Sequence, residues 1–353
     1  MPVNFPTLSV LLAHGFDDVI DVRSPAEFAE DHIPGAINLP ALDNDQRAEV
    51  GTVYKQVSPF DARKIGAGMV IRNVASHIEG PLADKHGGWR PLLYCWRGGQ
   101  RSGVFGSLLK EIGWRAETIA GGYQSFRRLV HHTLYDLPLP HKFVLLDGYT
   151  GTAKTALLPY LAARGVQIID LEELAQHRGS LLGAMPDGQP AQKGFETVLA
   201  VALHSLDPDQ PVIVEAESSK IGKLVLPPSL WQAMQVAPRI VVDAPRAERA
   251  AYLAKAYAEV LADSEKLAQR LAPLRRVRGN SIVDHWIKLS AEGALVDLSA
   301  ALITDHYDPA YDKSRHRPQD GTTERIMSDH LGEDGLERTA DAIVKALGRI
   351  TLQ

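Results

Sequence analysis

A loop with two glycines and a lysine, D-G-Y-T-G-T-A-K-T at residues 147–155, lies between an apolar run and a helical pattern. The apolar run, K-F-V-L-L-D, predicts a buried strand, and the helix is expected from about Lys154. Strand, loop and helix in this order are the context of a Walker A loop, whose backbone amides bind phosphate. Such a loop requires a parallel sheet covered by helices, so the second half of the chain is predicted to be α/β.

Further apolar runs fit the same architecture. Those at residues 166–170, 211–215 and 239–243 alternate with helical patterns, and ligands of such sheets bind at the carboxyl ends of the strands. From about Pro245 the chain is alanine-rich and predicted to be helical. The first third also has α/β texture, with strands at residues 19–22, 36–40, 91–95 and 116–120. Residues 41–90 are predicted to be mostly irregular.

The chain has 353 residues, which is long for a single core, so two domains are expected. The segment D-L-P-L-P-H, residues 136–141, has two prolines and no periodicity, which is typical of a boundary. We therefore expect a first domain over residues 1–136. The second is expected over 137–353, a parallel-sheet domain with a helical C-terminal region from about residue 245.

Composition places the chain among ordinary folded proteins, with 45% hydrophobic and 23% charged residues. It has no apolar run long enough to cross a bilayer, and its first residues lack a basic stretch followed by an apolar one. A cytoplasmic location is expected. The single cysteine excludes an internal disulfide.

That cysteine begins the run C-W-R-G-G-Q-R-S, Cys95 to Ser102, at a predicted strand-to-helix turn. Successive backbone amides of such a turn form an anion-binding concavity. A thiol beside cations and a helix N-terminus has a lowered pKa and acts as a nucleophile. Cys95, Arg97 and Arg101 are the predicted catalytic residues, and the anion loop would include Gly98, Gly99, Gln100 and Ser102. The alternative is a buried cysteine that acts only as a small apolar side chain.

This loop, with D-V-R-S-P-A-E-F at Asp21–Phe28 and D-H-I-P-G-A-I-N-L-P at Asp31–Pro40, resembles the rhodanese family. Five residues separate Cys95 from Arg101, one more than in most rhodaneses and the number found in phosphatase-like loops. The wider loop favours a phosphorus-bearing donor such as selenophosphate or thiophosphate, and it leaves a phosphatase open. Asp21 and Arg23 are expected to stabilise the fold around this loop.

The Walker-like loop departs from the full pattern at Ala153, where glycine normally precedes the lysine. ATP hydrolysis is therefore doubtful, whereas phosphate binding remains expected. A basic and hydroxyl-bearing turn is a predicted second phosphate contact, and carboxylates at strand ends could orient a metal ion or water. The predicted diphosphate-binding residues are Gly148, Tyr149, Thr150, Gly151, Thr152, Ala153, Lys154, Thr155, His177, Arg178, Gly179 and Ser180. The candidate carboxylates are Asp170, Glu215 and Glu217, with Thr155 and Glu215 as possible Mg²⁺ ligands. Glu217 could equally face solvent.

Charge is unevenly distributed. Residues 1–54 contain 2 basic and 9 acidic side chains, whereas residues 55–128 contain 12 basic and 5 acidic ones. A second basic run holds Arg270, Arg275, Arg276 and Arg278. Both runs are candidate RNA-phosphate surfaces, or alternatively ordinary solvated faces.

The motifs in this order resemble the tRNA 2-selenouridine synthases. The resemblance rests on C-W-R-G-G-Q-R-S, G-Y-T-G-T-A-K-T, L-E-E-L-A-Q-H-R-G-S, V-E-A-E-S-S-K-I-G and H-Y-D-P-A-Y, and it covers nearly the whole chain. It implies action on wobble 2-thiouridine in tRNAs for lysine, glutamate and glutamine. A geranyl group from geranyl diphosphate is attached to the sulfur, and selenium from a supply of selenophosphate then displaces the S-geranyl group. The phosphate loop would bind the diphosphate, with Mg²⁺, and the Cys95 loop the selenophosphate.

Two other hypotheses remain. The chain could be a rhodanese-type sulfurtransferase or phosphatase that uses Cys95 alone, with a regulatory nucleotide-binding domain. It could also be a non-catalytic module that senses anions or binds tRNA.

Overall fold

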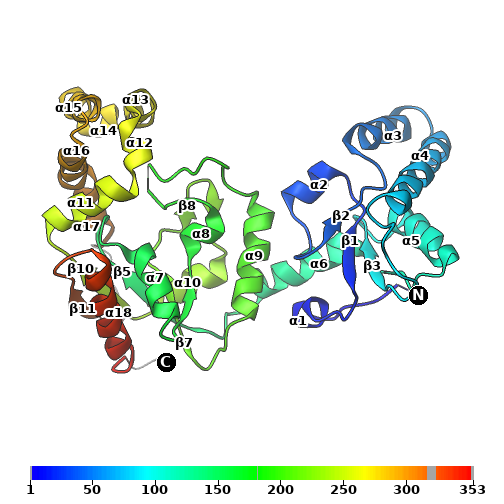
Figure 1. Ribbon diagram of the computed structural model, residues 1–353, viewed down its shortest axis with the longest axis horizontal. Helices are drawn as coiled ribbons and strands as arrows, with labels where there is room; N and C mark the ends of the chain where they lie inside the picture. The colour runs from blue at the N-terminus through cyan, green and yellow to red at the C-terminus, as the bar shows by residue number, and fades with distance from the viewer. Residues whose placement is uncertain (1, 181, 316–322, 351–353) are drawn as a thin grey trace. The chain divides into compact units, whose positions relative to one another are not determined.

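The structure, a computed structural model, describes residues 2–180, 182–315 and 323–350. Two compact units make up the chain (Figure 1). Unit 1 takes Met1–Leu137 and Pro190–His204, and unit 2 takes Pro138–Gln189 and Ser205–Gln353. The first break falls inside the proline-containing segment. Residues 190–204 differ from the expected division, because their helix α9 packs within unit 1 although it follows the phosphate loop in sequence.

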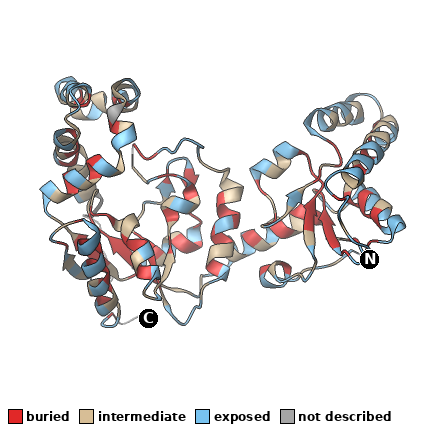
Figure 2. Ribbon diagram, in the orientation of Figure 1, coloured by how far each residue is buried: buried red, intermediate tan, exposed pale blue. Residues whose placement is uncertain are grey.

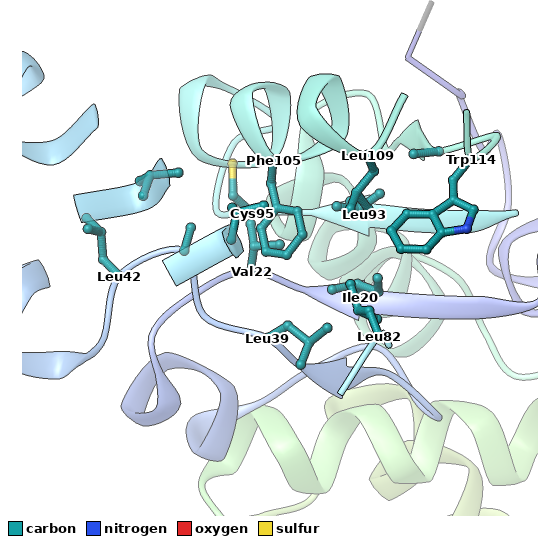
Figure 3. Packing of buried hydrophobic residues seen from close by; sticks show 14 of the residues in the cluster. Ile20, Val22, Leu39, Leu42, Leu82, Leu93, Cys95, Phe105, Leu109 and Trp114 are labelled. Carbon is teal, nitrogen blue, oxygen red and sulfur yellow. The ribbon is translucent and has the colours of Figure 1, made fainter. Parts of the chain in front are cut away.

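Unit 1 is built on a parallel four-stranded sheet in the order β2-β1-β3-β4. Its strands are β1 (Asp18–Asp21), β2 (Ile37–Asn38), β3 (Pro91–Tyr94) and β4 (Glu117–Thr118). The helices around it are α1 (Leu8–Leu12), α2 (Pro25–Glu30), α3 (Asn44–Gln56), α4 (Pro59–Glu79), α5 (Gln100–Ile112), α6 (Gly122–His131), the π-helix η1 (His132–Asp136) and α9 (Gln192–His204). Ile20, Leu93, Phe105 and Leu109 form the centre of the core next to Cys95 (Figure 3).

The prediction of an irregular segment over residues 41–90 is wrong, because α3 and α4 occupy most of it. Asp43 caps α3 with a capping box closed by Gln46, and Ser58 caps α4. Helix α3 has no fully buried residue (Figure 2), although its Val50 and Val53 recur at helical spacing. Helix α4 buries Ala62, Gly66, Val70 and Val74 at four-residue intervals, so the sequence carried a helical pattern that the prediction overlooked.

Unit 2 contains a parallel five-stranded sheet in the order β11-β10-β5-β7-β6. The strands are β5 (Lys142–Asp147), β6 (Gln167–Ile169), β7 (Pro211–Glu215), β10 (Arg239–Asp243) and β11 (Thr323–Met327), and a small antiparallel pair joins β8 (Lys220–Ile221) to β9 (Leu224–Val225). The associated helices are α7 (Lys154–Ala162), α8 (Leu171–Ala175), α10 (Pro228–Val236) and α18 (Glu333–Leu347). Parallel sheets in both units confirm the predicted α/β fold.

Strand β11 interrupts the C-terminal region that was predicted to be helical. Its sequence, T-E-R-I-M, alternates between exposed and half-buried residues at the sheet edge and therefore lacks the apolar run of a central strand. The other described part of the region is mainly helical, and the helices between α11 and α17 have their own core around Trp286. Its elements are α11 (Arg246–Ala256), α12 (Ala258–Ala262), α13 (Ser264–Leu271), η2 (Ala272–Leu274), α14 (Arg275–Arg278), α15 (Asn280–Ala291), α16 (Leu295–Leu302), η3 (Ile303–Tyr307) and α17 (Asp308–Arg315).

Within the described ranges, none of the helices combines the length and the apolar character that a bilayer span requires.

Candidate functional site

Cys95 lies directly after β3, at the start of the loop that leads into α5. Its side chain is buried, with 3% of the residue exposed, and it packs near Phe105 at the foot of that helix (Figure 3). Two donors reach the sulfur. The Ser102 hydroxyl donates to Sγ over 3.2 Å, and the Gly99 amide donates to it over 3.3 Å.

These donors stabilise the ionised thiol. Burial raises the pKa of Cys95, but the hydrogen bonds from Ser102, the positive charge of Arg101 and the amide of Gly99 outweigh it, so the pKa is lowered overall. A lowered pKa increases the fraction of Cys95 present as thiolate, which is the nucleophilic form. Burial alone would have given the opposite shift, so Cys95 is not simply an apolar core residue.

The two predicted arginines have different environments. Arg101 donates to Glu27 of α2 over 2.9 Å, and the carboxylate is half-buried. Arg97 is exposed on the loop, as is Gln100 at the start of α5. Glu27 therefore orients the Arg101 guanidinium before any anion binds at the loop. Glu27 was not a candidate, since nothing local in the sequence connects it to a residue 74 positions away.

Close packing fixes the shape of this loop. Gly98 has φ +64°, and a Cβ there would lie 2.6 Å from the carbonyl oxygen of Ile119. Gly122, with φ +58°, leaves no room for a Cβ beside the carbonyl oxygen of Cys95. The amide of Tyr123 donates to that same oxygen over 2.9 Å. The N-terminal end of α6 therefore holds the loop in place.

Beneath this contact lies a buried ion pair. Arg23 donates to both carboxylate oxygens of Asp21, and both residues are fully buried. The Arg23 guanidinium also lies 3.9 Å from the centroid of the Tyr123 ring. The Tyr123 hydroxyl in turn donates to Asp31 over 2.7 Å. These contacts agree with the expectation that Asp21 and Arg23 support the fold.

The phosphate loop joins β5 to α7. Gly148 and Gly151 adopt positive φ, and Ala153 also does, at +58°. A left-handed backbone at this position explains why glycine is the usual residue before the lysine, and the loop adopts this conformation with alanine instead. Lys154 donates to the Gly148 carbonyl oxygen over 2.8 Å, so its ammonium group lies across the mouth of the loop.

A second set of side chains holds the loop from outside. Buried Arg249 of α11 donates to the Thr150 carbonyl oxygen and forms an ion pair with Asp308 over 2.5 Å. The Tyr311 hydroxyl donates to Asp147 over 2.5 Å, and its ring lies 4.4 Å from that of Tyr149. Asp308 and Tyr311 belong to H-Y-D-P-A-Y, whose place beside the loop the sequence did not show.

Carboxylates gather at the carboxyl ends of β6 and β7. Thr155 donates to Glu215 over 2.6 Å and stands 3.1 Å from Glu172. Burial and the neighbouring charges of Glu172 and Asp170 raise the pKa of Glu215 well above its usual range. Burial, followed by the charge of Glu217, raises the pKa of Glu172 to about 7. Glu172 was missed, although it lies only two residues beyond Asp170.

This cluster fits a magnesium ion in part. In the described residues, no three His, Cys, Asp or Glu side chains are arranged to hold a metal ion. One Glu215 oxygen is nevertheless buried without a hydrogen-bond partner, next to the hydroxyl of Thr155. Mg²⁺ commonly uses one or two protein oxygens and takes its other ligands from water and phosphate, so the residue pair is compatible with it.

The phosphate loop and the carboxylates open onto a cavity of about 1030 Å³ in unit 2. Its polar end includes Lys154, Thr155, Glu172 and Glu217, so Glu217 faces the cavity. Its other wall is apolar and aromatic, and includes Leu253, Ala256, Tyr252, Tyr257 and Tyr307.

The turn at residues 177–180 also contributes to this cavity. Arg178, Gly179 and Ser180 line it, whereas His177 is buried behind them. The Arg178 guanidinium donates to the carbonyl oxygen of Ala256 over 2.6 Å and stacks on Tyr257. The structure therefore brings this turn together with the phosphate loop. Tyr149 and Thr152 support the loop from behind and do not line the cavity.

Of the C-terminal arginines, three are engaged within the chain. Arg270 donates to the carbonyl oxygen of Leu182, Arg275 pairs with Asp284, and Arg278 donates to His306. Arg276 is exposed. Their contact with RNA stays a prediction.

Residues 7–129 match the model of the rhodanese-like domain, and residues 141–271 match that of the tRNA 2-selenouridine synthase AAA domain. The tRNA 2-selenouridine synthase of Nitrosomonas europaea is 37% identical over 262 residues, covering 72% of this chain and 68% of that protein. That of Aeromonas salmonicida is 38% identical over 257 residues, covering 71% and 68%. That of Alcanivorax borkumensis is 32% identical over 331 residues, covering 83% and 88%. With both domains matched and relatives aligned along most of their length, this chain belongs to the tRNA 2-selenouridine synthase family.

Proposed function

We propose that this chain modifies tRNA by geranylating the sulfur of wobble 2-thiouridine and then replacing the S-geranyl group with selenium. The observation that carries the proposal is the cavity of unit 2, in which a phosphate loop and an aromatic wall meet. A prenyl diphosphate has these two parts, a charged head and an apolar tail. Family membership supplies the substrate class, since the relatives are named tRNA 2-selenouridine synthases.

In the first step the sulfur attacks C1 of geranyl diphosphate and the C1–O bond breaks. Diphosphate leaves with the bonding electrons, and N3 of the base loses its proton. Lys154, Arg178 and the loop amides would neutralise the leaving charge, which is the main requirement for an allylic diphosphate. Thr155 and Glu215 would hold a Mg²⁺ ion, which would add positive charge at the same diphosphate. No nucleotide hydrolysis is needed.

The geranyl tail would lie along the apolar wall of the cavity. Tyr252, Leu253 and Ala256 come from α11, and Tyr307 from η3, so the helical region after residue 245 supplies this wall. Arg178 adds a positive charge to this wall, because its guanidinium stacks on the Tyr257 ring and both residues line the cavity. Apolar burial of the tail would add affinity in proportion to the surface covered.

In the second step selenophosphate would bind at the Cys95 loop. Its selenium attacks C2 of the base, the geranylated sulfur leaves as a thiolate, and hydrolysis of the P–Se bond releases phosphate. Arg101 and the loop amides would hold the phosphate group of the donor. The Cys95 thiolate would either polarise the donor or carry its selenium.

The test uses the full chain, a 2-thiouridine-containing anticodon stem-loop RNA, geranyl diphosphate and Mg²⁺, with or without selenophosphate. Product masses are compared for the wild type, Cys95→Ala, Lys154→Ala and a matched control, Lys345→Ala, whose side chain is exposed on α18. We expect Lys154→Ala to lose geranylation, Cys95→Ala to keep it but lose selenium entry, and the control to behave as wild type.

A second candidate is favoured by the Cys95 loop itself, which has the five-residue spacing of phosphatase-like loops and a stabilised thiolate. If the wild type leaves the RNA unchanged but cleaves a phosphate ester, or transfers sulfur from thiosulfate to a thiol, the chain is a phosphatase or sulfurtransferase. That outcome would refute the proposed tRNA modification.

A further inference from the structure

The tip of the α3–α4 hairpin, residues 51–64, carries large apolar side chains that are not buried in the core. Tyr54, Val57 and Phe60 are 56%, 73% and 68% exposed. Helix α3 has no fully buried residue (Figure 2), although its Val50 packs partly against the core. A group of exposed apolar side chains at one point of a surface commonly marks an interaction site.

The tip of this hairpin is also positively charged. Lys55, Arg63 and Lys64 are exposed, and Asp61 is its single acidic residue. Asp61 stands 3.9 Å from Lys64. Among the described residues, neither Lys55 nor Arg63 forms an ion pair. The Arg63 Nε donates to the carbonyl oxygen of Pro59, but no acidic partner in the described residues neutralises either cation. Both cations lie within a few residues of the two exposed aromatic rings.

Exposed aromatic rings close to cations suit unpaired nucleotides. Bases stack on tyrosine and phenylalanine, while lysine and arginine contact the phosphates. A second copy of the chain is a weaker match. Stable protein interfaces bury at least about 1,200 Å² in total, which three side chains at a narrow turn do not provide. Closely placed positive charges would also repel their counterparts on a second copy.

We propose that the tip of the α3–α4 hairpin, residues 51–64, is a contact surface for unpaired nucleotides of the RNA substrate. This inference rests on the proposed action on tRNA and adds to it a specific surface. Tyr54 and Phe60 stack on bases, and Lys55 and Arg63 bind the adjoining phosphates. The surface lies outside the residues that hold the thiol or the diphosphate, so it contributes to RNA affinity rather than to either chemical step.

The experiment measures binding of a fluorescently labelled anticodon stem-loop RNA to the full chain by anisotropy, over a range of salt concentrations. We expect Tyr54→Ala and Phe60→Ala each to weaken binding by about 5-fold or more, as loss of a stacked base does. Tyr54→Phe should bind as wild type, because the ring is retained. Lys55→Ala and Arg63→Ala should each lower the slope of log affinity against log salt by roughly 0.7.

Ile71→Ala and Lys345→Ala are the matched controls. Ile71 is exposed on α4 beyond the tip and Lys345 is exposed on α18, outside both basic runs, so these variants should bind normally. Thermal melting and sedimentation of every variant show whether it is folded and monodisperse. Crosslinking with 4-thiouridine-substituted RNA, followed by peptide mapping, should identify residues 51–64.

The outcomes separate this inference from the proposed function. If the wild type binds and geranylates the RNA, but all tip variants bind equally well and no crosslink maps to the tip, the surface assignment is wrong and the function stands. If the wild type binds no RNA, both fail. If tip variants change the sedimentation coefficient but not RNA affinity, the surface joins two copies of the chain instead.

Discussion

Replacing Ser102 by alanine should raise the pKa of Cys95 and slow its reactions near neutral pH. The Ser102 hydroxyl donates to Sγ over 3.2 Å and is fully buried, so water cannot readily take its place. A hydrogen bond to a charged group contributes about 1.5–3 kcal/mol, and one pKa unit corresponds to about 1.4 kcal/mol. The expected rise is therefore roughly one to two units. Below the pKa, this lowers the thiolate fraction by about tenfold to a hundredfold.

The chain has one cysteine, so alkylation by iodoacetamide reports Cys95 alone. Rates followed by mass spectrometry from about pH 5.5 to pH 10 give the pKa directly. Ser107→Ala, an exposed serine on the same helix, is the control and should leave the curve unchanged. An equal or lower pKa in Ser102→Ala would show that the hydroxyl does not stabilise the thiolate, and would refute the reasoning.

The lowered pKa of Cys95 in the wild type also predicts that the stability of the folded protein depends on pH. Because the pKa of Cys95 is lower in the folded protein, ionisation of the thiol stabilises the folded state. This contribution is complete above the ordinary thiol pKa and is lost as the pH falls through the lowered value. The difference in unfolding free energy between wild type and Cys95→Ala should therefore shrink as the pH is lowered through that range in urea titrations.

Gly122→Ala should lower the urea midpoint and slow Cys95 alkylation, because φ is +58° and the new Cβ would collide with the Cys95 carbonyl oxygen. Gly113 has φ +106° but open space where a Cβ would lie, so Gly113→Ala should lower the free energy of unfolding only by the roughly 1–2 kcal/mol of backbone strain. Equal losses of stability in both variants would contradict the packing argument. Asp308→Ala should destabilise unit 2 by about 3–5 kcal/mol in chemical denaturation, because it leaves the buried Arg249 without its ion pair. Glu196→Ala should destabilise unit 1 by a similar amount, read as a lower melting temperature; a shift of less than about 2 °C would count against a buried ion pair.

Both loops could be predicted from the sequence because their signals are local. Around Cys95 and Lys154, a buried strand, closely spaced glycines and a helix follow one another within about fifteen residues, and the backbone then places the groups. Glu172 was within reach of the same reasoning, since it follows β6 as Glu215 ends β7.

Long-range partners were not accessible in this way. Arg101 pairs with Glu27, and Arg249 with Asp308, only because tertiary packing brings them together. From the sequence alone, several other acidic side chains were equally plausible partners for either arginine. Helices α3 and α4 were accessible in principle. Buried residues recur every four positions along α4, from Ala62 to Val74, and this helical spacing can be read from the sequence.

Helix α9 has a consequence for how the protein is made. Its Glu196, 3% exposed, pairs with Arg127 and accepts a hydrogen bond from the Tyr135 hydroxyl. During translation, residues 1–137 leave the ribosome well before this helix does, and β5, α7, β6 and α8 emerge in between. Unit 1 is therefore complete only after the first elements of unit 2 have been synthesised. A gene fragment cut after residue 137 would encode a domain without α9, and would leave Arg127 without Glu196.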